Sequence, residues 1–190
     1  NKIETQESIE RITNLPVLGK ILHNYKKSNN VVFEYPKSPI SESYRVLRTN
    51  LDFAMKGGTH KVIMVTSCIT GEGKSFNALN VAMSYAQLGR KTILVNFDLR
   101  KHASYFDKQE DISIGLSTYL INKVDLKDII LKSVDNKLDY INSGPVPPNP
   151  AELLALDETK KLIMTLKESY DYVIIDTPPL AQVTDGFLLM

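Results

Sequence analysis

Apolar runs of strand length alternate along this chain with longer segments whose apolar residues recur every three or four positions. The short runs predict buried β-strands, and the recurring pattern predicts amphipathic helices that pack on them. The predicted strands cover residues 61–66, 91–97, 138–142 and 172–176. The predicted helices cover residues 42–55, 76–88 and 152–169, the first with Ser41 as its N-cap. Strands that alternate with helices indicate an α/β fold with a mostly parallel sheet flanked by helices.

The first forty residues carry weaker patterns. Residues 7–12 predict a short helix, and the apolar segment at residues 15–22, broken by proline and glycine, predicts a strand or an extended lead-in. Residues 24–39 are polar and contain two prolines, which predicts a linker or surface loop. We therefore expect residues 1–40 to be lead-in and linker, and residues 41–190 to form the main domain.

Shorter elements are expected in the second half of the chain. Residues 115–121 and 126–132 predict two short helices. The prolines within residues 144–150 predict a rigid loop, because proline fixes the backbone angle φ.

The segment between the first predicted strand and its helix is Ser67-Cys68-Ile69-Thr70-Gly71-Glu72-Gly73-Lys74-Ser75. A helix that starts after such a turn presents unpaired backbone N–H groups and the positive end of its dipole, which together favour a polyphosphate. Glycines permit close backbone approach, Lys74 supplies a point charge for the outer phosphates, and the Ser75 hydroxyl can bind Mg²⁺. These features predict a phosphate-binding loop of the Walker A type.

The residues expected to contact a nucleotide in this loop are Thr70, Gly71, Glu72, Gly73, Lys74, Ser75 and Phe76. One position departs from the pattern, because Cys68 stands where a glycine is usual, and we expect a small thiol to be accommodated there. The alternative is a glycine-containing turn that only joins strand to helix. That alternative gives the Lys-Ser pair little purpose.

Two aspartates follow apolar runs. Asp98 comes directly after residues 91–97, and Asp176 ends residues 172–176. The carboxyl ends of parallel strands face the crevice where open α/β sheets bind ligands, so both are candidate site residues. Asp176 has the pattern of a Walker B carboxylate, which holds Mg²⁺ directly or through water. The alternative for Asp98 is a turn or N-cap aspartate. Apolar runs that end in aspartate are common in α/β proteins, so the pattern at Asp176 is strong evidence only together with the loop at Lys74.

Composition limits the classes of function. The 190 residues, 43% of them hydrophobic, suit one α/β domain with its own core. The net charge of +1 gives no overall field to attract nucleic acid or an anionic membrane, and we expect no nucleic-acid partner. A single cysteine excludes a disulfide framework and is typical of a reducing compartment. The histidines lack metal-ligand spacing and are expected at the surface: His23, His60 and His102.

Targeting signals give little guidance. No stretch approaches the roughly 20 apolar residues that span a bilayer, and no signal peptide is recognisable. The chain starts without methionine and stops shortly after the segment of Asp176, so we interpret it as an excised or truncated domain.

The helix predicted near residues 41–56 carries Glu42, Arg45 and Arg48 at intervals of three. Such residues fan over roughly a third of a helix circumference. The spacing alone favours a solvated face with one Glu42–Arg45 pair that contributes a few tenths of a kcal/mol.

Taken together, these segments resemble the cytoplasmic kinase domain of the bacterial tyrosine kinases that regulate capsule and exopolysaccharide assembly. The resemblance runs from about Leu15 to the last residue. It rests on five motifs in the order of that family: Glu42-x-x-Arg45-x-x-Arg48, Gly71-Glu72-Gly73-Lys74-Ser75, residues 93–100, residues 144–154, and Asp176-Thr177-Pro178-Pro179.

The resemblance implies a P-loop NTPase-like fold, truncated at its C-terminus, and an ATP-dependent protein-tyrosine autokinase. ATP and Mg²⁺ would be the cofactors. Lys74, Asp98 and Asp176 would be catalytic, and Ser75 would hold the metal ion together with the two aspartates. Arg100 would join residues 70–76 in binding the nucleotide, with a solvated basic pair, Arg100 and Lys101, as the alternative.

The resemblance also implies partners. The helix at residues 41–56 would lie at the subunit interface of a ring-shaped homo-oligomer, through Glu42, Arg45 and Arg48, which replaces the interpretation as a solvated face. Neighbouring subunits would phosphorylate a tyrosine-rich tail beyond Met190. A transmembrane polysaccharide co-polymerase segment, in the same chain or in a partner, would precede the lead-in. The implied localisation is that of a cytoplasmic domain of a bacterial inner-membrane protein.

One departure from that family affects the chemistry. The family places two carboxylates in its second acidic motif, where this chain has Asn96 and Asp98. An asparagine accepts a hydrogen bond but neither takes a proton nor balances a cation. Three explanations stay open: two aspartates suffice, the domain is a weak kinase, or the asparagine is an engineered substitution.

Two rival functions follow. Partitioning and site-placing ATPases share the fold but carry a second lysine early in the loop, where this chain has Ile69. The missing lysine argues against this rival. A nucleotide-binding regulatory scaffold, which assembles with ATP but transfers no phosphoryl group, is the rival that Asn96 favours.

Overall fold

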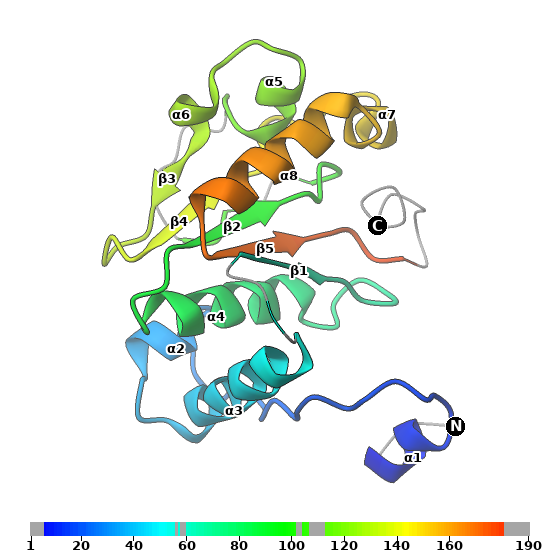
Figure 1. Ribbon diagram of the computed structural model, residues 1–190, viewed down its shortest axis with the longest axis vertical. Coiled ribbons are helices and arrows are strands. Elements are labelled where there is room, and N and C mark those ends of the chain that lie inside the picture. Colours follow the sequence, from blue (N-terminus) through cyan, green and yellow to red (C-terminus); the bar gives the residue numbers. More distant parts are fainter. Residues whose placement is uncertain (1–5, 56, 58–59, 102–103, 107–112, 181–190) are drawn as a thin grey trace.

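The computed structural model describes residues 6–55, 57, 60–101, 104–106 and 113–180. Helices and strands alternate through most of the described chain (Figure 1). In chain order they are α1 Gln6–Glu10, α2 Val31–Glu34, α3 Pro39–Ala54, β1 Lys61–Val65, α4 Lys74–Ala86, β2 Thr92–Asn96, α5 Leu116–Leu120, α6 Leu126–Ile129, β3 Leu131–Lys132, β4 Leu138–Ile141, α7 Pro150–Leu154, α8 Asp157–Ser169 and β5 Tyr172–Asp176.

The five strands form one sheet in the order β1-β5-β2-β4-β3. All pairs are parallel except β3 with β4, so the predicted mostly parallel α/β fold is confirmed. The strands β1 and β2 both pair with β5, which therefore lies between them. This register puts Val65 and Asn96 beside Asp176, one on each side, at the carboxyl end of the sheet.

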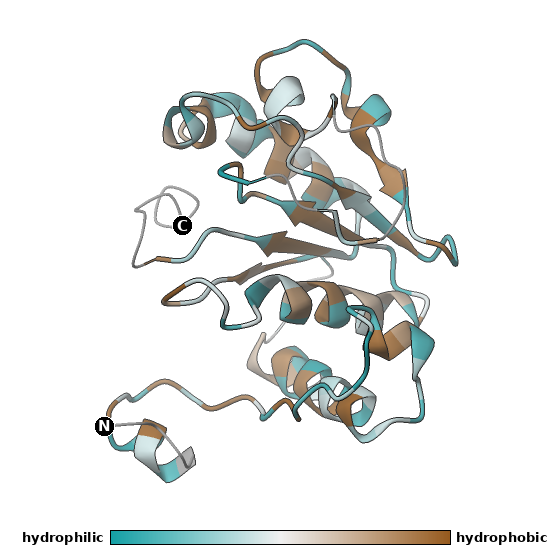
Figure 2. Ribbon diagram, turned by 180° about the vertical axis from the view of Figure 1, so that it is seen from behind, coloured by the Kyte–Doolittle hydropathy of each residue, from teal (hydrophilic) through white to brown (hydrophobic). Residues whose placement is uncertain are grey.

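Helices cover both faces of the sheet (Figure 1). On one face α4 packs against the strands and α2 and α3 pack on α4, while α5 to α8 cover the other face. Successive residues of β2 illustrate the division, because Leu94 joins the first core and Ile93 and Val95 join the second. Figure 2 shows the strands as a hydrophobic layer between helices of mixed polarity.

The helix α3 begins earlier than predicted. Ser38, not Ser41, is the N-cap: its hydroxyl accepts a hydrogen bond from the Ser41 N–H, and Pro39 occupies the first helical position. Ser41 is fully buried, and its own hydroxyl donates to the Val31 and Tyr35 carbonyl oxygens. The helix ends at Ala54, before Gly57.

The prediction of a surface loop at residues 24–39 is wrong in its middle. Those residues contain the short helix α2, whose Val31 and Val32 belong to the core. Residues 15–22 form no strand. They run along α3, where the Asn50 side chain donates to the Leu18 carbonyl oxygen and Leu47 lies against Gly19.

Two further predictions need correction. The single helix expected at residues 152–169 is two, α7 and α8, separated at Leu156, whose backbone is extended. The helix expected at residues 126–132 ends at Ile129, and the chain then forms β3.

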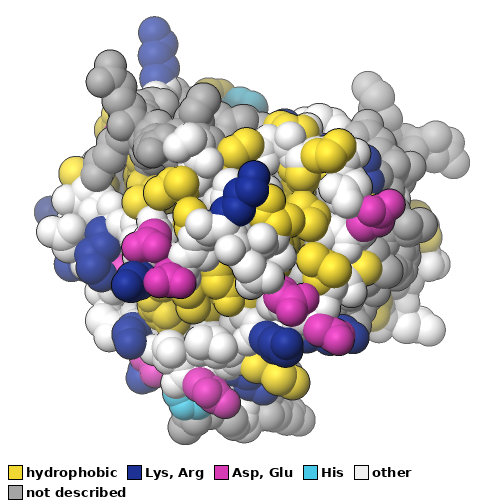
Figure 3. All heavy atoms as spheres, turned by 90° about the horizontal axis from the view of Figure 1, so that it is seen from above, with side chains coloured by type: hydrophobic (Ala, Val, Ile, Leu, Met, Phe, Trp, Pro, Cys, Tyr) yellow, Lys and Arg dark blue, Asp and Glu magenta, His cyan; other side chains and the backbone are white. Residues whose placement is uncertain are grey.

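The surface supports some of the expectations from composition. His23 and His60 are exposed as predicted, and His102 lies outside the described residues. The face seen in Figure 3 intermixes basic, acidic and apolar side chains. Among the described residues, we find no helix with the length and apolar character needed to cross a membrane.

Candidate active site

The predicted phosphate loop joins β1 to α4. Gly71 and Gly73 both have left-handed backbone conformations, with φ of 90° and 83°. Residues with a side chain rarely adopt that conformation, which explains the glycines in this turn. Gly73 is the N-cap of α4, so Lys74 and Ser75 begin the helix. The first N–H groups of α4 have no partner within the helix and meet the positive end of its dipole.

A cleft opens over this helix start. Loop residues, the beginning of α4 and two residues that follow β2 and β5 line it: Ser67, Thr70, Gly71, Gly73, Lys74, Ser75, Phe76, Lys101 and Pro179. Six of the seven residues of this segment that the sequence predicts at the phosphates line the cleft, and Glu72 is the exception. The loop, the helix start and the strand ends thus converge on one place.

Glu72 lies differently. Its carboxylate accepts hydrogen bonds from the backbone N–H groups of Cys68, at 2.8 Å, and Ile69, at 3.1 Å. The side chain thus bridges the first half of the loop to the second. Cys68, the departure from the glycine of the pattern, is exposed.

Lys74 and Asp176 form a buried ion pair. The Lys74 ammonium lies 2.5 Å from one carboxylate oxygen of Asp176 and 3.3 Å from the Ser75 hydroxyl. The two charged side chains are only 6% and 1% exposed. The pair joins the loop to the end of β5, although Lys74 and Asp176 are far apart in the sequence.

Tyr105 occupies the other oxygen of Asp176. Its hydroxyl donates to Asp176 at 3.0 Å. Burial, and then the negative charge of Asp176, raise the pKa of Tyr105 well above its usual value, so the hydroxyl remains a hydrogen-bond donor. The sequence analysis missed Tyr105, because a single tyrosine in an irregular segment has no pattern that marks it.

Asp98 lies two residues beyond the end of β2. It is 4% exposed, and its carboxylate lies 3.5 Å from the Lys101 ammonium. Asn96 is also buried, and its side-chain oxygen accepts the Asp98 backbone N–H at 3.0 Å. The charge of Asp98 contributes to the raised pKa of Tyr105, which indicates that both aspartates act on that hydroxyl. Arg100 follows as an exposed residue.

The oxygen donors of this site suit Mg²⁺. A magnesium ion that binds with a nucleotide keeps several waters and takes one or two carboxylates besides phosphate oxygens. Asp176, Asp98 and the Ser75 hydroxyl, the three ligands expected from the resemblance, carry hard oxygen atoms of that kind. Within the described ranges, no group of three or more His, Cys, Asp or Glu side chains is placed to hold a metal ion by itself.

A second hollow shares Ser75 and Phe76 with the cleft over the loop. It is lined by Asn29, Ser75, Phe76, Leu79, Ser104 and Tyr105. Ser75 and Phe76 thus contribute to two openings, one lined by the loop glycines and one lined by Tyr105.

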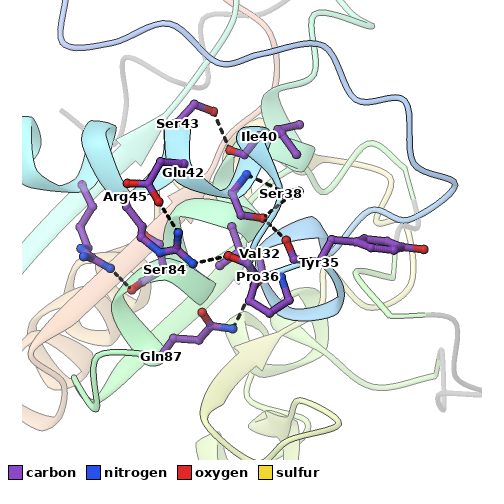
Figure 4. Close-up of polar contacts among 12 residues, drawn as sticks. Val32, Tyr35, Pro36, Ser38, Ile40, Glu42, Ser43, Arg45, Ser84 and Gln87 are labelled. Carbon is purple, nitrogen blue, oxygen red and sulfur yellow. Dashed lines mark hydrogen bonds and ion pairs between the residues drawn. The ribbon is translucent and has the colours of Figure 1, made fainter.

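The remaining predicted residues lie on α3, away from the phosphate loop. Glu42 and Arg45 form an ion pair, and Arg45 also donates to the Pro36 carbonyl oxygen (Figure 4). Arg48 donates to the Ser84 carbonyl oxygen of α4 at 2.7 Å. The two arginines therefore tie α3 to its own chain in this structure.

Comparisons with known proteins agree on one class. Residues 60–189 match the protein family described as an AAA domain. The chain is 41% identical over 164 residues to the tyrosine-protein kinase YwqD of Bacillus subtilis, covering 85% of this chain and 68% of YwqD.

Solved structures give the same picture. The crystal structure of the chimerical protein CapA2B2 is 42% identical, with a TM-score of 0.88 over 97% of this chain and 80% of that one. The kinase domain of the Escherichia coli tyrosine kinase ETK is 31% identical, with a TM-score of 0.88 over 97% of this chain and 76% of that one.

Proposed function

The chain belongs to the family of bacterial tyrosine-protein kinases, and we propose that it transfers the γ-phosphoryl group of Mg·ATP to tyrosines of a neighbouring copy. The observation that carries this proposal is the convergence of Lys74, Asp176 and Asp98 at one end of the sheet, beside a loop built for phosphates. Through this reaction the protein would regulate the synthesis and export of capsular or exopolysaccharide.

The loop would bind the phosphates. Backbone N–H groups at the start of α4 supply donors, and Lys74 supplies a positive charge. Lys74 is paired with Asp176, and its ammonium has three donors, so it would contact phosphate oxygens beside or in place of that carboxylate. Ser75 and Asp176 would hold Mg²⁺, with Asp98 as a further ligand. When bound, the metal ion would neutralise charge on the phosphates.

Asp98 would accept the proton of the acceptor tyrosine. The phenolic oxygen forms a bond to the γ-phosphorus while the bond from that phosphorus to the bridging oxygen of ADP breaks, and the phenolic proton passes to the carboxylate. The second opening, lined by Ser75 and Tyr105 among others, would admit the acceptor. The positions of the side chains thus supply orientation and charge, which carry most of the catalysis in phosphoryl transfer.

Helix α3 would form the contact between subunits of a ring. Besides Glu42 and Arg45, it exposes two large apolar side chains seven residues apart, Val46 at 51% and Phe53 at 74%. Residues seven apart lie on the same face of a helix. An apolar stripe flanked by an ion pair is a surface that a second copy of the chain can cover.

The partners and the location are proposed from membership of the family. The acceptor tyrosines would lie in a tyrosine-rich tail of the neighbouring subunit. A transmembrane polysaccharide co-polymerase segment, in the same chain or in a partner, would hold the domain at the cytoplasmic side of the bacterial inner membrane.

A second candidate is a nucleotide-controlled scaffold without transfer. Asn96 supports it, because this buried amide stands beside Asp176 where the family has a carboxylate, and it hydrogen-bonds the backbone of Asp98. A neutral amide adds no charge to the metal site.

The experiment is incubation of the full-length protein with Mg·ATP and quantification of phosphotyrosine by mass spectrometry. Lys74→Met is expected to abolish labelling, and Asp98→Asn to reduce it about 100-fold or more with nucleotide still bound. Lys161→Met is the matched control, because Lys161 is exposed on α8, and it should label normally. Nucleotide binding without phosphotyrosine in the unmodified protein would favour the scaffold.

A further inference from the structure

One side chain in the first turn of α4 connects the phosphate loop to α3. The Asn77 side-chain amide donates to the Gly73 carbonyl oxygen at 3.0 Å, and the Asn77 backbone N–H donates to the same oxygen at 2.8 Å. The Asn77 side-chain oxygen accepts a hydrogen bond from the Tyr44 hydroxyl of α3 at 2.7 Å. A continuous chain of hydrogen bonds therefore runs from α3 to the last residue of the loop.

Tyr44 is firmly held. Its side chain is completely buried, and its ring meets that of Phe76 edge to face, with centroids 6.2 Å apart. Burial raises the pKa of Tyr44 far above its usual value, so the hydroxyl stays protonated and donates at any physiological pH. Because the hydroxyl uses the oxygen of Asn77, the amide of Asn77 is oriented with its NH₂ group toward Gly73.

The Gly73 carbonyl controls a phosphate donor. The carbonyl of Gly73 and the N–H of Lys74 belong to one planar trans peptide unit, so they point in opposite directions. Gly73 has a left-handed backbone, and a glycine peptide has more rotational freedom than any other. Two hydrogen bonds that fix the carbonyl against α4 therefore fix the Lys74 N–H on the opposite side of the peptide.

We propose that Tyr44 and Asn77 are positioning residues that hold the Gly73–Lys74 peptide in its phosphate-binding orientation, so that nucleotide affinity depends on α3. The proposal rests on the nucleotide site of the proposed function, and it adds a physical connection between that site and the helix with the exposed Val46 and Phe53. By reciprocity, a partner that shifts α3 changes nucleotide affinity, and nucleotide changes the affinity for that partner by the same factor.

A purely structural role for Tyr44 is the competing explanation, and Tyr85 provides the matched control. Tyr85 is also fully buried between the same two helices, and its hydroxyl donates to Asp52 of α3 at 3.1 Å. It lies at the far end of α4 from the loop. Replacing either tyrosine with phenylalanine removes one buried hydroxyl between α3 and α4, but only Tyr44→Phe breaks the connection to Gly73.

The test measures the affinity of the full-length protein for Mg·ADP by calorimetry, together with the melting temperature of each variant. Tyr44→Phe is expected to weaken binding about three- to tenfold, the range for one hydrogen bond. Tyr85→Phe should change the affinity less than about twofold, while its melting temperature falls about as much as that of Tyr44→Phe. Asn77→Asp keeps an oxygen for Tyr44 but loses the donor to Gly73, so it should weaken binding at least as much as Tyr44→Phe.

A double variant completes the test. Tyr44→Phe added to Asn77→Ala should cause no further loss of affinity, because the hydroxyl acts only through the amide. Unchanged affinity in Tyr44→Phe, an equal loss in Tyr85→Phe, or additive losses in the double variant would each overturn the proposal and leave the proposed function standing. Absence of Mg·ADP binding by the unmodified protein would overturn both, whereas binding without tyrosine phosphorylation would overturn only the proposed function.

Discussion

Breaking the ion pair of Lys74 and Asp176 should destabilise the protein even without nucleotide. The two side chains are 6% and 1% exposed and lie 2.5 Å apart, so removing one leaves the other as a buried, uncompensated charge. Such a loss costs roughly 3–5 kcal/mol. Asp176 keeps the Tyr105 hydroxyl as a donor, so we expect Lys74→Met to cost about 3 kcal/mol, near the lower end of that range. In a domain of this size that corresponds to a fall in melting temperature of roughly 6–12 °C.

A double-mutant cycle isolates the pair. Lys74→Met, Asp176→Asn and the double variant are unfolded with urea in the absence of nucleotide. The free energy of unfolding of the double variant should exceed the value expected from adding the two single losses by at least about 2 kcal/mol, because the double variant leaves no unpaired charge. The same cycle on the exposed pair Lys160–Asp157, with side chains 72% and 80% exposed, should show coupling of about 0.5 kcal/mol or less. Additive losses at Lys74 and Asp176 would refute the reasoning.

Three other predictions concern stability and the loop. Burial and a hydrogen bond to Asp52 raise the pKa of Tyr172 to about 12, so the folded protein keeps a proton that the unfolded chain releases near pH 10. The stability that Tyr172 contributes is full below pH 10 and falls as the pH rises to 12. The urea midpoint of unfolding should therefore decrease less between pH 9 and pH 11 in Tyr172→Phe than in the unmodified protein. Gly115→Ala should cost about 2 kcal/mol or more in urea unfolding, because the added Cβ would lie 2.4 Å from the Gly144 nitrogen. Glu72→Ala should weaken Mg·ADP binding roughly threefold and Glu72→Gln much less, because an amide oxygen still accepts the two loop N–H groups. Equal losses of affinity in calorimetry would exclude a role of Glu72 in holding the loop.

The sequence predicted the parts of the fold that have strong local patterns. The resemblance to bacterial tyrosine kinases is confirmed, as are the strands β1, β2, β4 and β5 and the helix after the loop. The strands β1, β2 and β5 are apolar runs and the helix has a clear period, which are the signals that sequence reading detects best, whereas β4 is a short strand with apolar and polar residues. The parallel register of β2 and β5 then brings Asn96 beside Asp176, because both residues end their strands at the same edge of the sheet.

Elements whose position depends on tertiary contacts were not predictable. The helix α2 has only four residues, and Val31 and Val32 pack into the core. A helix this short within a polar segment shows no apolar period in the sequence. The start of α3 was misplaced by three residues because Ser38 and Ser41 are both good N-caps, although the proline after Ser38 favours the first.

In the site, the missed residues act through contacts across the fold. Tyr105 reaches Asp176 from an irregular segment, and Asn77 joins the loop to a helix that starts more than 30 residues earlier in the chain. Neither contact follows from the spacing of residues along the sequence.

The measurement that tests the central claim most directly is phosphotyrosine formation by the full-length protein with Mg·ATP, with the Asn96 and Asn96→Asp forms side by side. The account predicts labelling in both forms, because Asp98 and Asp176 supply the carboxylates that transfer needs. Labelling of the Asp form alone would contradict it and identify the Asn form as a regulatory scaffold, and absence of label in both forms despite bound nucleotide would contradict the assignment of a kinase.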